Sequence, residues 1–155
     1  MKRHEAREQA FFLIFERTFQ EASLEELVES AQLARDITIC GFAQNVFHGV
    51  EKHGEEIDGM IEKHCIGWTK NRLSRVAVSV LRTAVYEMLY EEKIPVSVSI
   101  NEAVEIAKTY GSTEDASFVN GVPSPKNWRA RNESRVRNRY QQLHHLPCAL
   151  RCPSP

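Results

Sequence analysis

The stretch of sequence that decides the fold class is Arg72–Tyr90, RLSRVAVSVLRTAVYEMLY. Its apolar residues recur at steps of three and four, which on a helix gives an apolar stripe at least about 100° wide. The stripe consists of Leu73, Val76, Ala77, Val80, Leu81, Ala84, Val85, Met88 and Leu89. We therefore predict an amphipathic helix that ends before Lys93 and Pro95.

The same pattern resumes directly after this helix. Apolar residues at helical spacing run from Val96 to Tyr110, and Gly111 then ends the run as a C-terminal cap would. Pro95 suits the first turn of the new helix, because its missing N–H is not needed there. The sequence thus predicts two consecutive helices.

Four further helices are predicted upstream. Glu5–Phe19 contains an apolar block so dense that this helix is expected in the middle of a bundle. Ser23 and Glu26 have the spacing of a capping box and open the next helix. The other two are predicted over Asp36–Val50 and Ile57–Cys65. Because no period-two strand pattern of useful length occurs, the predicted class is all-α.

Length and composition are those of one domain with a core. The chain has 155 residues, of which 42% are hydrophobic, and no apolar run long enough to span a membrane. The N-terminus shows no secretory signal. The cysteines form no CxxC pair, so reduced thiols in a cytoplasmic protein are expected. They are Cys40, Cys65, Cys148 and Cys152.

The charge is divided abruptly along the chain. Residues 1–122 carry 13 Lys/Arg and 20 Asp/Glu, a net charge of −7, whereas residues 123–155 carry seven Lys/Arg and one Glu, a net charge of +6. Five of the six prolines also lie in the second segment. We therefore predict a boundary near residue 123.

A search for catalytic and metal-binding motifs finds little. Phosphate loops, GxSxG elbows and HExxH helices are absent from the sequence, which predicts a binding protein that is not an enzyme and carries no cofactor. Two groups contain ligand-type residues, and solvated histidines are the alternative for the first. They are His48, His53 and His64 near Cys65, and His144 and His145 with Cys148 and Cys152.

The beginning of the chain is basic in an otherwise acidic body. Lys2, Arg3, His4 and Arg7 lie in the first turns of the first predicted helix. Lys and Arg neutralise phosphates, and Arg also stacks on bases. A helix N-terminus favours anions, so unpaired basic groups there indicate an anionic partner. The alternative is a solvated terminus.

Five motifs follow one another in a fixed order along the body of the chain. The first is Arg7–Ala10 before an apolar run, and the more specific ones are Leu73–Val76, Leu81–Leu89, Ile94–Gly111 and Phe118–Val122. Together they resemble the NusB transcription antitermination family, and Arg7–Ala10 is similar to the start of its first helix. The resemblance covers residues 3–122. It implies two small helical bundles of six or seven helices that bind single-stranded boxA RNA in the leaders of ribosomal RNA operons. It also implies two partners: the small-subunit ribosomal protein that acts as NusE, and the RNA polymerase antitermination complex.

The resemblance also assigns roles to particular residues. Asn101 and Glu102 are expected to hold one helix against its neighbour. For Phe15 and Phe118 the alternative to base stacking is core packing. The residues it implies for RNA binding are Lys2, Arg3, Arg7, Phe15, Phe118 and Asn120.

Two questions remain open at this stage. The predicted domains are an RNA-binding body, residues 1–122, and an atypical basic tail, residues 123–155. The tail departs from the family at Pro123, either because it is translated out of frame and does not pack or because it is a true basic extension. The rival functions are a helical protein-interaction module and an RNA-binding domain related to that of ribosomal RNA cytosine methyltransferases.

Overall fold

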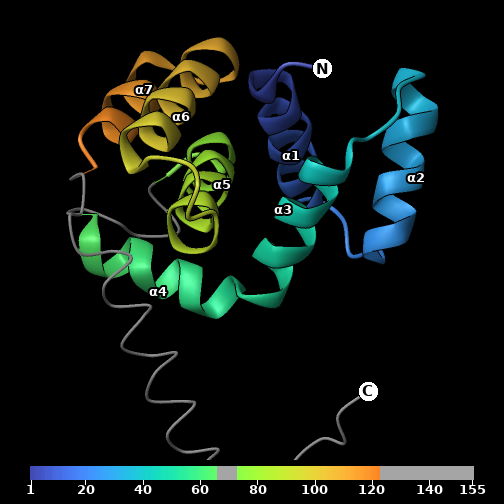
Figure 1. Cartoon of the computed structure of the whole chain (residues 1–155), viewed down its shortest axis with the longest axis horizontal. Coiled ribbons are helices and arrows are strands. Elements are labelled where there is room, and N and C mark those ends of the chain that lie inside the picture. The colour runs from blue at the N-terminus through green and yellow to red at the C-terminus, as the bar shows by residue number, and fades with distance from the viewer. Residues whose placement is uncertain (66–72, 123–155) are drawn as a thin grey trace, which may run out of the picture. The chain divides into compact units, whose positions relative to one another are not determined.

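The computed structural model describes residues 1–65 and 73–122, which belong to one compact unit and consist of helices joined by turns and loops (Figure 1). The predicted all-α class is confirmed. The seven helices of this part of the chain are α1 (Arg3–Arg17), α2 (Leu24–Arg35), α3 (Gly41–Lys52), α4 (Gly54–His64), α5 (Arg75–Tyr90), α6 (Val96–Tyr110) and α7 (Thr113–Asn120).

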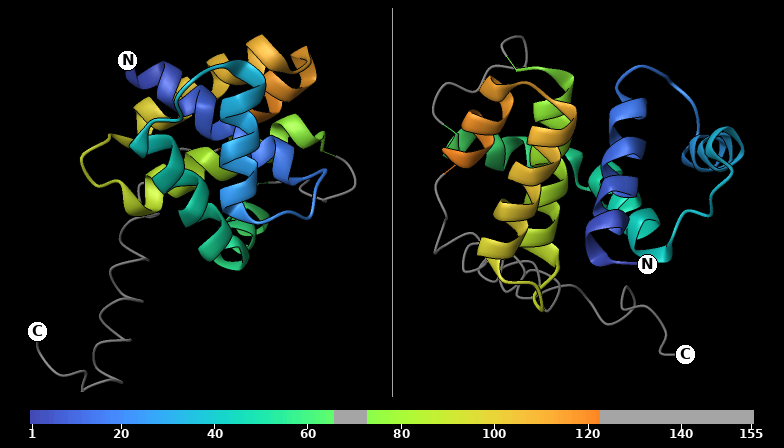
Figure 2. Two further views of the ribbon diagram at one scale, coloured as in Figure 1. Left: turned by 90° about the vertical axis from the view of Figure 1, so that its right-hand side faces the viewer. Right: turned by 90° about the horizontal axis from the view of Figure 1, so that it is seen from above.

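The helices form two small bundles that meet at α1 and α5. Helices α1, α2 and α3 lie together, and α5, α6 and α7 form the second group (Figure 2, right). Helix α4 leads from α3 to the side of α5. Helix α1 packs against α2, α3 and α5, as its apolar block predicted. The start of α1 is therefore held from both bundles, which matters for the site described below.

The core is built mainly from α1 and α5. In α5 the predicted stripe is buried from Ala77 to Leu89, and Leu81, Val85 and Met88 are almost fully enclosed. In α1 the buried side chains include Phe11 and Leu13. Phe47 of α3 is also fully buried, so the apolar surface that stabilises the fold is enclosed between α1, α3 and α5.

Helix α3 and helix α5 approach each other unusually closely at Gly49. A Cβ atom at this position would lie 2.0 Å from Cε2 of Tyr86. The absence of a side chain at Gly49 is therefore what lets the tyrosine ring lie against the backbone of α3.

The helix boundaries confirm some predictions and correct others. The Ser23–Glu26 capping box is present. Pro95 is the N-cap of α6 and does not lie in its first turn. Gly111 ends α6 as predicted, in an extended conformation, and a Cβ there would lie 2.7 Å from the Asp115 carboxylate. The prediction of a helix from Asp36 was wrong, because Asp36 has φ 49° and caps α2.

The predicted tail, 123–155, and its His/Cys group lie outside the described residues. Within residues 1–65 and 73–122, every helix is too short or too polar to cross a membrane.

Candidate nucleic-acid interface

The start of α1 presents two exposed cations. Lys2 and Arg3 are exposed, and within the described residues neither side chain forms an ion pair with a carboxylate. The Arg3 guanidinium lies 4.4 Å from the centre of the Phe42 ring, at the start of α3. A cation held over a ring keeps its charge available while its position is fixed. The two residues thus form a small positive surface at this end of the molecule.

His4 is held differently from its neighbours. Its ring hydrogen-bonds the Glu102 carboxylate of α6, and its second nitrogen lies 3.5 Å from Glu8. The hydrogen bond to Glu102 raises the pKa of His4, burial opposes this, and the charges of Glu102 and Glu8 add to the rise. His4 therefore carries a positive charge over a wider pH range than a free histidine does.

Arg7 is buried, which corrects the surface position that the sequence suggested. The residue is 5% exposed, and its Nε donates to Glu87 at 2.7 Å. The other carboxylate oxygen of Glu87 accepts from Ser99 at 2.9 Å. A buried charge is stable only when it is paired and hydrogen-bonded, and both conditions hold here. Arg7 thus fastens α1 to α5 and α6, with its charge facing inward.

Glu102 extends this link to the second bundle. Its carboxylate contacts His4 and lies 3.8 Å from Nη1 of Arg7. This contact between α6 and α1 is the helix-holding role that the sequence interpretation favoured for Glu102, whereas Asn101 is exposed. The network fixes where the start of α1, and with it the exposed cations, is placed.

Phe15 lies near the opposite end of α1. It is half-buried, with its ring centre 5.8 Å from that of Phe11 and 5.0 Å from that of Phe19. One part of the Phe15 ring therefore packs on the core and another part is exposed, and its role in base stacking stays a prediction. The sequence analysis did not single out Phe19, which is 57% exposed.

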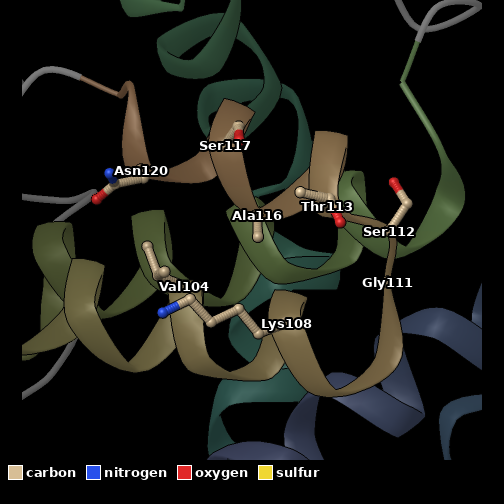
Figure 3. A pocket seen from close by; sticks show the side chains of 8 residues that line it. All are labelled: Val104, Lys108, Gly111, Ser112, Thr113, Ala116, Ser117 and Asn120. Carbon is tan, nitrogen blue, oxygen red and sulfur yellow. The ribbon is translucent and has the colours of Figure 1, made fainter.

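Phe118 and Asn120 come from α7, which packs mainly on α5 and α6. Phe118 is half-buried and Asn120 is exposed. Asn120 lines one end of a hollow of about 330 Å³ between α6 and α7, and Ser112 lies at the other end (Figure 3). The structure therefore does not gather the predicted RNA contacts at one point. Lys2 and Arg3 lie at the start of α1, Phe15 lies near its end, and Phe118 and Asn120 belong to α7 in the other bundle.

The metal candidate among the described residues lacks a built site. No group of three metal-binding side chains occurs within residues 1–65 and 73–122. Burial raises the pKa of the Cys65 thiol to about 11, so this thiol is protonated at neutral pH. His53 stacks on Tyr90, with ring centres 4.5 Å apart. The arrangement is one of packing contacts.

Fold and sequence together place the chain among known proteins. Residues 4–122 match the model of the NusB family. The chain is 44% identical over 124 residues to the transcription antitermination protein NusB of Bacillus subtilis (strain 168), with 80% of this chain and 93% of that protein covered. The chain is thus an all-helical protein of the same class as these transcription antitermination proteins.

Solved structures agree with this assignment. The fold matches T. maritima NusB with a TM-score of 0.67 at 32% identity, covering 83% of this chain and 96% of that one. It also matches a chain in the crystal structure of the antitermination factors NusB and NusE in complex with dsRNA, with a TM-score of 0.69 at 25% identity and coverage of 86% and 99%. The chain belongs to the NusB family, as the sequence motifs indicated.

Proposed function

We propose that this protein is a transcription antitermination factor that binds the boxA element of ribosomal RNA operon leaders. It acts in the cytoplasm together with the small-subunit ribosomal protein that serves as NusE, as part of an RNA polymerase antitermination complex. Membership of the NusB family supports the class, and the similar structure that contains NusB, NusE and RNA supports both kinds of partner. The protein acts by binding and does not catalyse a reaction.

The observation that carries the proposal is the pair of free cations at the start of α1. Lys2 and Arg3 are exposed in a body, residues 1–122, whose net charge is −7. Such a body repels RNA in general, so binding requires a local positive surface that is fixed in place. Arg3 is fixed by the Phe42 ring, and the buried Arg7–Glu87 pair fixes the helix on which both cations lie.

The test is a titration of the full chain with boxA-like RNA at several salt concentrations. The variant Lys2→Gln/Arg3→Gln should bind more weakly, and its salt slope should fall by about 0.7 for each lost phosphate contact on a single strand. Lys93→Gln, an exposed cation between α5 and α6, is the matched control and should leave the slope unchanged. An unchanged slope in the double variant would contradict this surface.

Two further titrations compare single-stranded with duplex RNA and measure the effect of the ribosomal protein. The same sequence offered as a duplex should bind less tightly than the single strand, because boxA recognition reads unpaired bases. The ribosomal protein should increase the affinity for RNA when it is added. If the chain binds the ribosomal protein but no RNA in either form, the protein-interaction module takes the place of this proposal.

A further inference from the structure

A row of aromatic side chains covers the second half of α1. Positions 12, 15 and 19 are spaced by three and four residues, so their side chains share one face of the helix and its end. The Tyr110 ring at the end of α6 lies edge-on to Phe12, with centres 4.9 Å apart. We call this row the aromatic stripe; it consists of Phe12, Phe15, Phe19 and Tyr110.

The aromatic stripe is partly open to solvent, which a purely structural cluster would not need. Phe19 is 57% exposed and Tyr110 is 39% exposed, while Phe12 and Phe15 are half-buried. Beneath them Phe11 is buried and stacks on both Phe15 and Tyr110. The buried ring anchors the stripe, and the outer rings keep free surface.

Two arginines lie on the rings of the stripe. Arg75, at the start of α5, lies 4.1 Å from the centre of Phe19, and Arg35 of α2 lies 4.2 Å from the centre of Phe12. Arg35 is also paired with Glu16 at 2.7 Å. Arg75 is exposed and forms no ion pair within the described residues.

The arginines of the described part of the chain have two kinds of partner, carboxylates and aromatic rings. Four of its six arginines pair with carboxylates, namely Arg7, Arg17, Arg35 and Arg82. The two that do not are Arg3 and Arg75, and each lies over an aromatic ring. In an acidic body, both guanidinium groups are thus left able to meet an external anion.

We propose that the exposed end of the aromatic stripe, with Arg75, is a second contact region for single-stranded RNA, in which a base stacks on Phe19 and Arg75 meets the phosphate backbone, next to Phe15, whose RNA contact the family resemblance already implies. This inference rests on the proposed RNA-binding function and extends it to residues that lie away from the basic start of α1. Stacking on aromatic rings and on guanidinium planes is the usual way in which proteins hold unpaired bases.

The length of α1 sets a minimum size for the RNA. The helix has 15 residues, or about 22 Å at 1.5 Å per residue. Lys2 and Arg3 lie at its start, and Phe19 follows its end. A strand stacked at about 3.4 Å per nucleotide needs roughly six or seven nucleotides to reach both regions. Shorter RNA engages one region at a time, so only the longer strands should gain affinity from both regions at once.

The experiment compares Phe19→Leu and Arg75→Gln with matched controls in titrations of the full chain. Phe19→Leu keeps an apolar side chain and removes the ring; it should weaken binding at least about fivefold. Arg75→Gln should lower the salt slope by about 0.7. Leu33→Ala, 79% exposed on α2, and Lys93→Gln are the controls and should bind like the parent.

A second measurement isolates stacking from charge. RNAs that carry a single abasic position keep every phosphate and lose one base. The effect of Phe19→Leu should vanish for one such position and persist for the others, because a ring with no base above it contributes nothing. RNAs shorter than about six nucleotides should bind the parent chain more weakly than longer strands, because they reach only one of the two regions.

The outcomes separate this inference from the proposed function. If the parent chain binds no boxA-like RNA, both fail. If the Lys2/Arg3 variant weakens binding while Phe19→Leu and Arg75→Gln behave like the controls, the proposed function stands and the stripe is not an RNA contact. If the two stripe variants lose the ribosomal protein and keep RNA, the stripe is a protein interface and the inference is overturned.

Discussion

Two regions along helix α1, the buried contacts of Arg7 and the surface just past its end, hold positive charge in different ways. At its start, Arg7 is buried and pairs with Glu87, while His4 pairs with Glu102. Past its end, Arg75 lies over the exposed Phe19 ring and has no carboxylate partner in the described part of the chain. The first arrangement uses charge to hold helices together, and the second leaves charge on the surface.

The difference teaches how to tell a structural arginine from one that is free for a ligand. A guanidinium that is enclosed and bonded to a carboxylate is neutralised in place, so it stabilises the fold. A guanidinium on a ring keeps most of its donors, because the ring contacts its face and not its edge. Arg3 belongs to the second kind although it is close in sequence to Arg7.

The largest expected effect is at the buried pair. Arg7→Met should destabilise the protein by about 3–5 kcal/mol, because it leaves the Glu87 carboxylate buried and without its cation. Denaturant unfolding followed by circular dichroism measures this. Adding Glu87→Met should recover part of the loss, since the orphaned charge is then removed.

An exposed pair on the same helix is the matched control. Arg17 pairs with Glu51 at 3.3 Å, and both side chains are about one third exposed. Arg17→Met should therefore cost less than Arg7→Met, about 1–2 kcal/mol, which includes the lost Nη1 hydrogen bonds to the carbonyl oxygens of Gln20 and Ala22. Equal losses at Arg7 and Arg17 would show that the contrast between the buried and exposed arginines has no energetic basis.

A smaller effect on stability is expected at the other end of the helix. Phe19→Ala should lower the free energy of unfolding by about 1 kcal/mol or less, because the ring is mostly exposed and loses only its edge contact with Phe15 and the surface contact with the Arg75 guanidinium. Phe11→Ala, by contrast, removes a ring that is 1% exposed and should cost about 3–5 kcal/mol. Thermal or denaturant unfolding of the two variants provides the measurement.

The ion pairs of His4 should make stability depend weakly on pH. The pKa of His4 is raised in the folded state, so its contribution is complete below the unfolded value of about 6.5 and is lost as the pH rises through the folded value. The difference between the parent and His4→Gln should therefore shrink above that window. Because the His4 side chain is partly exposed, solvent screening limits this difference in unfolding free energy to roughly 0.2–1 kcal/mol. A difference that grows with pH would contradict the assignment.

The smallest effect is expected from the tail. If residues 123–155 do not pack on the body that contains both ends of α1, a chain that ends at Val122 should melt at nearly the same temperature. The family model matches residues 4–122, which coincides with the change in composition. A large drop in melting temperature would favour a packed basic extension. Resequencing the codons around residues 118–123 decides whether the reading frame changes there.

The sequence was sufficient where structure depends on local spacing. The α5 stripe and the Ser23 cap follow from neighbours within a few residues, and both predictions are confirmed. Asp36 was misplaced because the segment before α3 is held by side chains from elsewhere. Gln9 accepts from the Cys40 N–H, and Gln32 accepts from the Ile39 N–H. Periodicity contains no information about such bonds.

The same reasoning explains the outcome for the candidate site. Lys2 and Arg3 are as exposed as the sequence suggested, whereas the burial of Arg7 depends on Glu87, 80 positions away. The roles of Phe15, Phe118 and Asn120 in RNA binding stay predictions. Phe12 and Phe19 did leave a signal, since they share the spacing of Phe15 on one face of α1. That signal was missed because, apart from Phe15, the apolar residues of this helix were interpreted as core.

The 80-position separation of Arg7 and Glu87 also has a consequence in time. At about 5–20 residues per second, the ribosome makes Arg7 roughly 4–16 seconds before its carboxylate partner. Meanwhile the pairs α5–α6 and α6–α7 join neighbours in the chain, and such local contacts form quickly. We therefore expect α1 to pack first on α2 and α3, and this group to close onto the finished α5–α6 pair in a late step. The ion pair that joins the two bundles is then among the last contacts to form.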